Sequence, residues 1–300
     1  MKENGAAHAA VQTPPAADPR GAGGRRRADD RGRVLRIAAV GDFHCGEQDA
    51  GAFRALFARA NDEADVLVLA GDLTRWGTPA EMRVVVGELA DVKIPIVAVL
   101  GNHDHEAGEV PEAIAILRER GVHVLDGDTF ELNETVGFAG TKGFMGGFGR
   151  GTLTAFGEPA TKAFVDCTLE EVKKLELALR KLSTPVRVVV LHYAPVVDTV
   201  VGEPEIIFPF LGTDRLAEPL DRYGATVAFH GHAHIGTFEG KTPGGIPVFN
   251  VSLALLRSTG VGEMYHLYEI PLPERRRAHE EEPSAAMHDD RDTAADPGRA

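Results

Sequence analysis

Cysteine is scarce in this chain: its 300 residues include only two, Cys45 and Cys167. Two cysteines cannot form the disulfide framework that holds small secreted domains together, so a reducing, cytoplasmic compartment is expected. Long apolar runs are also lacking, because no segment approaches the roughly 18 residues that a membrane-spanning helix requires. Residues 1–33 contain no apolar stretch of the kind found in secretory signals. The sequence therefore predicts neither a membrane protein nor a secreted one.

Positive charge is in short supply: 32 lysine and arginine residues face 45 aspartate and glutamate residues, and the net charge is -13. The basic excess of residues 1–33 and the acidic excess of residues 272–300 cancel, so the body of the chain carries this charge. Binding to nucleic acid depends largely on lysine and arginine contacts to phosphate, so we do not expect a nucleic-acid partner. A small phosphorylated substrate stays compatible, since bound metal cations reverse the local sign of the charge.

Large apolar side chains are rare at both ends of the chain. Residues 1–33 and 272–300 are rich in alanine, glycine, proline or charge, which is typical of disordered tails. Between them, residues 34–271 carry regular apolar patterns, and the chain as a whole is 43% hydrophobic. That segment is long enough for a sizeable core, so we predict one folded domain there.

In this central segment, short apolar runs alternate with amphipathic stretches of helical period. Such alternation predicts an α/β fold of stacked layers. The predicted strands are Val34–Val40, Asp65–Ala70, Ile94–Leu100, Val122–Leu125, Phe130–Phe138, Val186–Leu191, Thr226–His230, Ile246–Asn250 and Met264–Ile270. The predicted helices are Ala52–Glu63, Pro79–Leu89 with Thr78 as its cap, Pro111–Arg120, Thr168–Lys181 and Arg215–Tyr223.

Glycine gathers in one place. The stretch Ala139–Pro159 contains seven glycines, between a predicted strand and a predicted helix. Glycine-rich segments have low local stability, so this stretch is predicted to be a mobile lid. The alternative is a rigid glycine loop packed under the sheet.

The first sign of chemistry is the sequence Gly41-Asp42-Phe43-His44, which directly follows an apolar strand. Residues two apart on a strand project to the same side, so Asp42 and His44 can converge on one point. A carboxylate and an imidazole at that spacing suit a divalent metal ion. Alone, this short pattern also fits a polar strand end.

Four further strands end in similar polar signatures. They are Gly71-Asp72, Gly101-Asn102-His103-Asp104, His192 and the run His230-Gly231-His232-Ala233-His234. Asp42, Asp72 and Asn102 follow one another at steps of 30 residues. A β-α-β unit has a similar length of roughly 30 residues. Ligands of open α/β sheets bind beyond the carboxyl ends of the strands, so these residues are expected to meet at one edge.

These signatures supply more ligands than one metal needs. A single site uses three or four protein ligands, whereas a pair of ions about 3.5–4 Å apart shares a larger set. The candidate ligands are Asp42, His44, Asp72, Asn102, His192, His232 and His234. The sequence therefore predicts a site for two divalent metal ions.

The order of these motifs resembles the calcineurin-like metallophosphoesterase superfamily, whose pattern is D-x-H, G-D, G-N-H-D/E, H and G-H-x-H. The glycine-rich segment Gly140–Gly147 is similar to its small bacterial, Icc-related branch. The resemblance implies a four-layer α/β/β/α sandwich with a dinuclear metal site at the C-terminal ends of the strands. Nitrogen and oxygen ligands without thiolate suit Mn, Fe or Zn.

The resemblance also implies a role for each residue. Asp42, His44 and His234 would bind the first metal, Asn102, His192 and His232 the second, and Asp72 both. His103 would assist the leaving group and Asp104 would orient His103, which makes these two the candidate catalytic residues. A metal ligand or a structural histidine is the alternative for His103.

The implied activity is hydrolysis of a phosphate ester by a metal-bridging hydroxide. A small phosphodiester, such as a cyclic nucleotide or nucleotide derivative, is the preferred substrate. A phosphomonoesterase and a metal-binding scaffold of the same fold are the alternatives. Trp76, Arg75 and Tyr193 adjoin the motifs and either border the pocket or pack beside it, so no substrate-binding residue is assigned.

Overall fold

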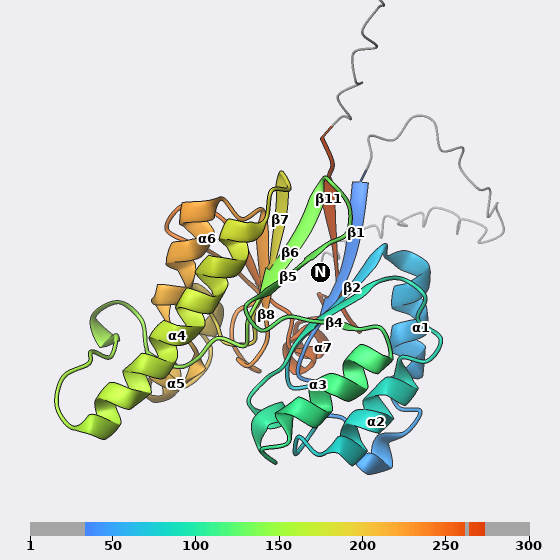
Figure 1. Cartoon of the computed structure of the whole chain (residues 1–300), viewed down its shortest axis with the longest axis horizontal. Helices are drawn as coiled ribbons and strands as arrows, with labels where there is room; N and C mark the ends of the chain where they lie inside the picture. The colour runs from blue at the N-terminus through green and yellow to red at the C-terminus, as the bar shows by residue number, and fades with distance from the viewer. Residues whose placement is uncertain (1–33, 262–263, 274–300) are drawn as a thin grey trace, which may run out of the picture. The chain divides into compact units, whose positions relative to one another are not determined.

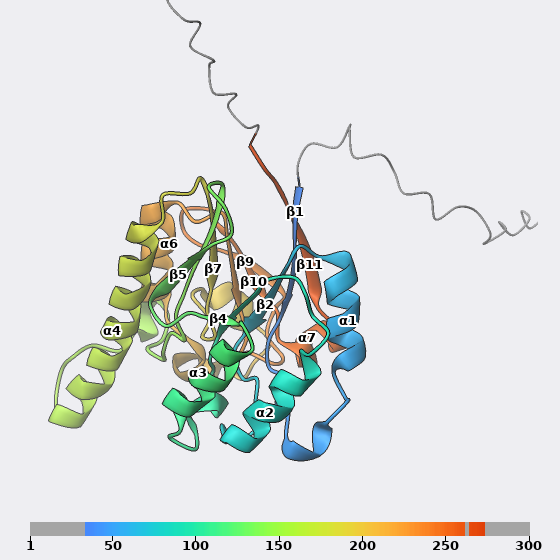
Figure 2. The same ribbon diagram turned by 45° about the vertical axis from the view of Figure 1, so that its right-hand side comes forward.

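The computed structural model describes residues 34–261 and 264–273 (Figure 1). Residues 1–33 and nearly all of 272–300 lie outside the described residues, so the disordered tails stay a prediction. Among the described helices, none is long and apolar enough to cross a membrane. The described residues form two β-sheets that face each other, with helices on both outer faces (Figure 2).

The first sheet has five strands in the order β11-β1-β2-β3-β4. All neighbours are parallel except β11, which runs antiparallel to β1. The strands are β1 (Val34–Val40), β2 (Val66–Ala70), β3 (Ile96–Val99), β4 (His123–Val124) and β11 (His266–Pro271).

The second sheet has six strands in the order β5-β6-β7-β8-β10-β9. Its four central strands are parallel, and the two edge strands run antiparallel to their neighbours. The strands are β5 (Asp128–Glu131), β6 (Val136–Gly140), β7 (Val186–Val190), β8 (Val227–His230), β9 (Glu239–Lys241) and β10 (Pro247–Asn250).

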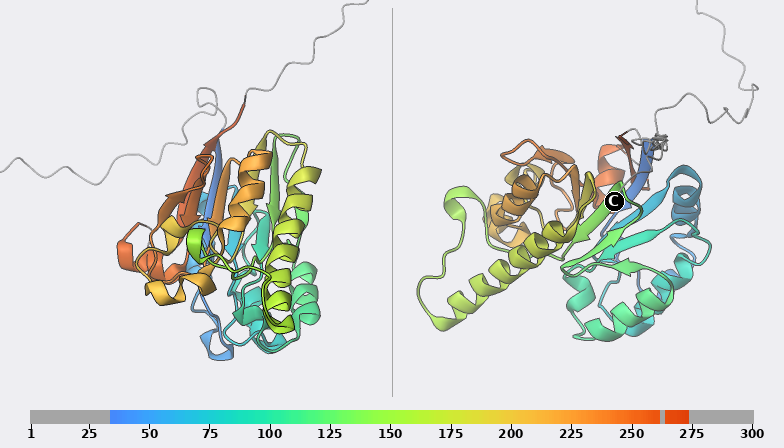
Figure 3. Two further views of the ribbon diagram at one scale, coloured as in Figure 1. Left: turned by 90° about the vertical axis from the view of Figure 1, so that its left-hand side faces the viewer. Right: turned by 45° about the horizontal axis from the view of Figure 1, so that its top comes forward.

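The helices complete four layers. Helices α1 to α3 cover the first sheet, and α4 and α6 cover the second, as the views in Figure 3 show. The helices are α1 (Arg54–Glu63), α2 (Pro79–Glu88), α3 (Val110–Glu119), α4 (Pro159–Lys181), α5 (Phe208–Leu211), α6 (Ala217–Tyr223) and α7 (Leu253–Thr259). Short 3-10 turns lie at Glu47–Asp49, His103–His105, Gly149–Gly151, Val197–Val200, Glu205–Ile207 and Asp214–Leu216. The predicted α/β/β/α sandwich is confirmed.

Strand β1 shows why the parallel strands read as continuous apolar runs. Ala38 and Val40 pack among the helices of the first sheet, whereas Ile37 and Ala39 pack against the second sheet. All four side chains are buried. A strand covered on both faces needs apolar residues at every position, and its polar residues are confined to its ends.

Two predicted elements are wrong in extent. The expected strand Phe130–Phe138 is a hairpin of β5 and β6, because Asn133 makes a turn and its Oδ1 accepts hydrogen bonds from the Thr135 and Val136 amides. The helix expected at Thr168–Lys181 begins at Pro159, which occupies its first turn. Cys167 therefore lies inside α4, where it is exposed, whereas Cys45 is buried.

The glycine-rich stretch divides into a packed part and an exposed part. Up to Gly147 it is held by hydrogen bonds: Gly143 N donates to Glu171 Oε2 (3.0 Å), and Gly147 N donates to Gly212 O (2.9 Å). Thr141 also donates to the buried Glu171 carboxylate. Residues 153–160, by contrast, are exposed. The structure thus agrees with the packed alternative for Gly140–Gly147.

Candidate metal centre

The polar signatures converge where parallel strands of both sheets end. Hydrogen bonds between backbones join the loops: Asp42 N donates to Gly71 O (2.9 Å), and Gly231 N donates to His192 O (3.1 Å). The loop after β1 is thus fixed to the loop after β2, and the loop after β7 to the loop after β8. All seven predicted ligands reach this one place, where they form two groups.

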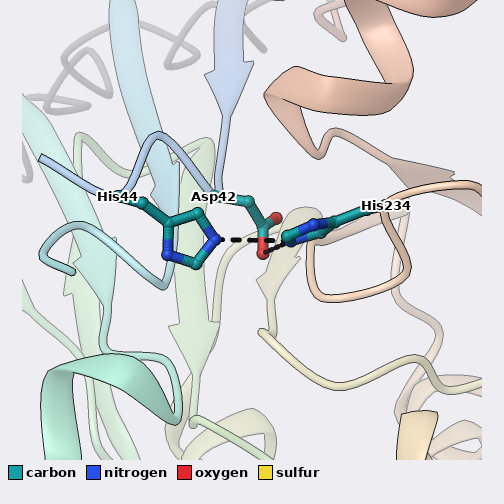
Figure 4. Close-up of side chains that lie close together, drawn as sticks. All are labelled: Asp42, His44 and His234. Carbon is teal, nitrogen blue, oxygen red and sulfur yellow. Dashed lines mark hydrogen bonds and ion pairs between the residues drawn. The ribbon is translucent and has the colours of Figure 1, made fainter. Parts of the chain in front are cut away.

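The outer group consists of Asp42, His44 and His234 (Figure 4). Its possible ligand atoms lie within 4.8 Å of one another. His234 Nε2 lies 3.1 Å from Asp42 Oδ1 and 3.4 Å from His44 Nε2. The side chains of His44 and His234 are 22% and 42% exposed, while that of Asp42 is buried. The outer group therefore opens to solvent.

The inner group consists of Asp72, Asn102, His192 and His232. His192 Nε2 lies 2.9 Å from Asn102 Oδ1 and 3.4 Å from Asp72 Oδ1. The possible ligand atoms of Asp72, His192 and His232 lie within 4.8 Å of one another. The His192 side chain is 0% exposed and that of Asp72 is 2% exposed, so the inner group lies deeper than the outer one.

Asp72 lies between the two groups. Its Oδ1 is 3.4 Å from His192 Nε2 in the inner group, and its Oδ2 is 3.9 Å from His44 Nε2 in the outer group. The backbone amide of His103 also donates to Asp72 Oδ1 (2.8 Å), which fixes the carboxylate. This is the position that a shared ligand of two cations must occupy.

Backbone carbonyls orient the imidazoles. His192 Nδ1 lies 3.0 Å from Ala70 O, and His232 Nε2 lies 3.1 Å from Phe210 O. A carbonyl oxygen can only accept, so these ring nitrogens carry the proton. The other nitrogen of each ring is then unprotonated and free to bind a metal, as is usual for histidine ligands.

Burial sets the protonation state of the histidines. It lowers the pKa of His44 to about 4 and of His232 to about 3, and it holds the pKa of His192 well below its ordinary value. His234 differs, because its hydrogen bond to Asp42 raises its pKa. Neutral imidazole is the form that binds metal ions.

Burial acts in the opposite direction on Asp72. Desolvation, together with the charges of Asp42 and Asp104, raises the pKa of Asp72 to about 9. Three acidic side chains close to one another in a buried place repel unless cations lie between them. The donor set therefore fits divalent cations: neutral imidazoles, an amide oxygen and carboxylates whose ionised form needs positive charge nearby.

The backbone is strained at the same residues. Among the described residues, the only non-glycine residues with positive φ are Asp42 (55°), His44 (43°), Asp72 (50°) and His232 (71°). Left-handed backbone is costly for residues with a side chain and concentrates at functional sites. All four residues are predicted metal ligands.

Two glycines give the carboxylates room. A Cβ atom on Gly101 would lie 2.1 Å from Asp72 Oδ1, and one on Gly231 would lie 2.2 Å from Asp42 Oδ2. Both distances are far below a van der Waals contact, so no other residue fits without moving a carboxylate. Glycine is thus required at these two positions by the close approach of a neighbouring loop.

His103 lies beside the outer group. Its ring centroid is 4.5 Å from that of His44, and its Nδ1 lies 2.7 Å from the carbonyl of Arg75. Since Nδ1 donates to this carbonyl, Nε2 is the nitrogen available for proton transfer. His103 also forms a group with His44 and Asp72 whose possible ligand atoms lie within 4.8 Å, so the alternative role as a ligand is compatible with the geometry.

The contacts of Asp104 correct the role that the resemblance implies. Its buried carboxylate accepts hydrogen bonds from the amides of Leu73, Thr74 and Gly101 and from Thr74 Oγ1, at 2.5 to 3.2 Å. None of the hydrogen bonds that Asp104 makes with other described residues involves the His103 ring. Asp104 therefore joins the loops after β2 and β3, and the Arg75 carbonyl orients His103. Sequence reasoning missed this because it depends on the backbone path.

Sequence reasoning assigned no role to Lys142, which lies next to the inner group. Its Nζ lies 4.9 Å from the ring centroid of Phe144 and 5.1 Å from that of Tyr193, and its carbonyl accepts from His192 N (3.0 Å). The side chain is half-buried, and desolvation lowers its pKa. The available signal was a single lysine in the glycine-rich stretch.

Known proteins resemble this chain in sequence and in fold. Residues 35–236 match the family model described as calcineurin-like phosphoesterase. A probable cyclic nucleotide phosphodiesterase of Fibrobacter succinogenes is 30% identical over 97 residues, which are 29% of this chain and 37% of that protein. The match thus spans little more than a third of that relative's length.

Two solved structures have a similar fold. Phosphopantetheinyl hydrolase from Mycobacterium tuberculosis superposes with a TM-score of 0.57 at 16% identity, covering 83% of this chain and 99% of that one. The protein TT1561 of Thermus thermophilus superposes with a TM-score of 0.50 at 14% identity, covering 80% of this chain and 99% of that one. At such low identity these likenesses concern the fold alone.

Proposed function

Because the chain belongs to the calcineurin-like phosphoesterase family, whose members are phosphoester hydrolases, we propose that it hydrolyses a small phosphodiester with the help of two divalent cations. One cation would bind the outer group and the other the inner group, with Asp72 contacting both. Mn, Fe or Zn fits the nitrogen and oxygen donors.

The observation that carries this proposal is the placement of Asp72 between two sets of donors. Its two carboxylate oxygens lie 3.4 Å from an inner imidazole nitrogen and 3.9 Å from an outer one. A structural site for a single metal would need neither a second set of donors nor a shared carboxylate. When bound, two such cations stabilise charge on the phosphoryl oxygens and lower the pKa of water.

The chain's own residues perform the remaining work. The loops that carry the candidate ligands hold the phosphate of the substrate beside the two groups. The inner group is buried, so it excludes water from its own side of the phosphate. His103 holds a proton on Nε2 and gives it to the oxygen of the leaving alcohol. The carbonyl of Arg75, 2.7 Å from Nδ1, keeps the ring turned for this transfer.

Similarity to a known protein favours a diester over a monoester. The matched segment of the Fibrobacter relative, a probable cyclic nucleotide phosphodiesterase, supports this choice.

A turnover screen tests the proposal. Protein purified without chelator is supplied with Mn²⁺ and offered bis-p-nitrophenyl phosphate, p-nitrophenyl phosphate and 3′,5′-cyclic AMP, while metal content is measured in parallel. We expect about two metal ions per chain and faster hydrolysis of a diester than of p-nitrophenyl phosphate. Faster hydrolysis of the monoester would make the protein a phosphomonoesterase, and bound metal without any turnover would make it a scaffold.

A further inference from the structure

Trp76 is an exposed aromatic side chain beside the candidate metal centre. It is the single tryptophan of the chain, and it is 57% exposed. It lies between β2 and α2, four residues after the shared ligand Asp72. Large aromatic rings contribute strongly to binding, so an exposed ring beside a site is a candidate contact for the ligand of that site.

The turn that carries Trp76 is fixed by buried groups. Trp76 N donates to Oε2 of the buried Glu81 (2.7 Å), and Gly77 N donates to Thr74 Oγ1 (3.2 Å). A Cβ atom on Gly77 would lie 2.7 Å from the carbonyl oxygens of His103 and Asp104, so the turn is packed directly against the His103 turn. The backbone that carries the exposed indole therefore has a well-defined position.

That position is on the side where the leaving alcohol would lie. The ring centroids of Trp76 and His103 are 6.5 Å apart with the planes inclined by 44°. Arg75, the preceding residue, provides the carbonyl that orients His103. One short turn thus positions both the proton donor and a flat apolar surface next to it.

We propose that Trp76 is a specificity-determining residue: its indole stacks on a planar aromatic group, such as a nucleobase, that is esterified on the His103 side of the phosphate. This inference rests on the proposed function, since it names the class of substrate that the same site takes. Stacking of a base on an aromatic side chain is sequence-tolerant, because every base has a flat face. The substrates would then be nucleotide-like phosphoesters of differing bases.

Two ligands that differ only in the base test this inference. Adenosine 5′-monophosphate and ribose 5-phosphate are compared as inhibitors of bis-p-nitrophenyl phosphate hydrolysis by the metal-loaded protein. We expect adenosine 5′-monophosphate to inhibit more tightly by roughly 5- to 150-fold, which corresponds to about 1–3 kcal/mol of stacking. Because Trp76 is the sole tryptophan, its emission should change with adenosine 5′-monophosphate and not with ribose 5-phosphate.

Variants separate stacking from general effects. Trp76→Ala should bring the inhibition ratio close to one, and Trp76→Phe should retain most of it, since phenylalanine keeps a flat ring. Phe156→Ala is the matched control, because Phe156 is an 86% exposed aromatic residue outside the site. It should leave both the ratio and the change in emission as in the parent protein.

An unchanged ratio in Trp76→Ala, or equal inhibition by both ligands in the parent protein, overturns the inference while the proposed hydrolysis stands. If no phosphoester is hydrolysed at all, the proposed function fails instead. The emission titration needs no turnover and then decides the inference by itself: a change with adenosine 5′-monophosphate alone supports it, and no difference between the ligands overturns it.

Discussion

The inner and outer groups contain similar residues in different surroundings. In the inner group, His192 is fully buried and a carbonyl fixes its proton. In the outer group, His234 is 42% exposed and bonds directly to Asp42. Burial lowers the pKa of His192, whereas the bond to Asp42 raises the pKa of His234. The difference teaches that one half of the centre is built into the core and the other half opens to solvent.

This contrast assigns different tasks to the two cations of the proposed function. The inner group offers preoriented, neutral nitrogens in a place from which water is largely excluded, so its cation should exchange slowly. The outer group adjoins His103 and is open to solvent, so its cation should exchange readily and lie close to the reacting ester. Asp72 is the residue that couples them.

The largest effect is expected from removing that coupling. Asp72→Asn replaces the charged shared ligand by a neutral one, so both cations should bind weakly. Each cation stabilises the transition state by several kcal/mol, so turnover should fall by about 10⁴-fold or more. Metal content and turnover are measured together, with Asp62→Asn, an exposed carboxylate of α1, as the control. Loss of a single metal would show that Asp72 belongs to one group only.

The next effect concerns the outer side. His103→Gln should keep both metals and the fold, but lose on the order of 10²–10⁴-fold in rate on esters with alkoxide leaving groups. The loss should be much smaller for p-nitrophenolate, which leaves readily without a proton. Turnover of both ester types and metal content are the measurements. A lost metal, or equal loss on both esters, would identify His103 as a ligand or a positioning residue.

A smaller effect distinguishes the two groups through their glycines. Gly101→Ala displaces Asp72 and should weaken both metals alike. Gly231→Ala displaces the outer ligand Asp42 and should weaken the outer metal more than the inner one, which it affects only through the bond between Asp42 and the His232 amide. We expect about 10–100-fold lower affinity, as for other changes that misplace a ligand. Titration with a metal-sensitive dye measures each affinity. Equal losses of both metals in the two variants would contradict the division into groups.

Gly87→Ala is the matched control for these substitutions. Gly87 lies in α2, and a Cβ atom there would have no neighbour within 4 Å. Alanine should therefore leave metal binding unchanged and stabilise the helix by about 0.5–1 kcal/mol. Thermal unfolding of the variant measures its stability, so that a change in metal binding can be distinguished from a change in the fold.

The smallest effect requires no substitution. Protons and cations compete for the same imidazole nitrogens. Among the imidazole ligands, His234 has a raised pKa and the others have lowered ones, so His234 takes up a proton before them as the pH falls and the outer cation should leave first. The inner cation should stay until lower pH, because burial lowers the pKa of His232 to about 3. Metal content after equilibration at successively lower pH should fall in two steps, and a single step would contradict the contrast.

Much of the fold could be predicted, because parallel strands covered on both faces have continuous apolar sequences. Elements without such a pattern were missed or misplaced. Strand β9 is the three residues Glu239–Lys241 with no apolar side chain, and the first turns of α4 are largely exposed. The turn at Asn133 was not predicted, because apolar and polar residues alternate around it as they do in a single strand.

The residues of the candidate centre could be predicted from the sequence, but the hydrogen bonds that position them could not. The seven expected ligands come together because each follows a strand that ends at the same edge. Their roles as ligands stay a prediction. Backbone groups make these connections: the carbonyls of Ala70 and Phe210 orient two histidines, and backbone amides donate hydrogen bonds to Asp104. Where backbone groups lie depends on the path of the chain, so the order of residue types does not predict these hydrogen bonds.

The two cysteines and the one tryptophan provide a spectroscopic ruler. Burial raises the pKa of Cys45 to about 12, which makes its thiol inert, whereas Cys167 is exposed on α4. A thiol-reactive acceptor dye would therefore attach at Cys167 in the native protein. Energy transfer from Trp76 to that dye would report the distance between Trp76, which lies beside the metal centre, and Cys167 on α4 without any engineered residue.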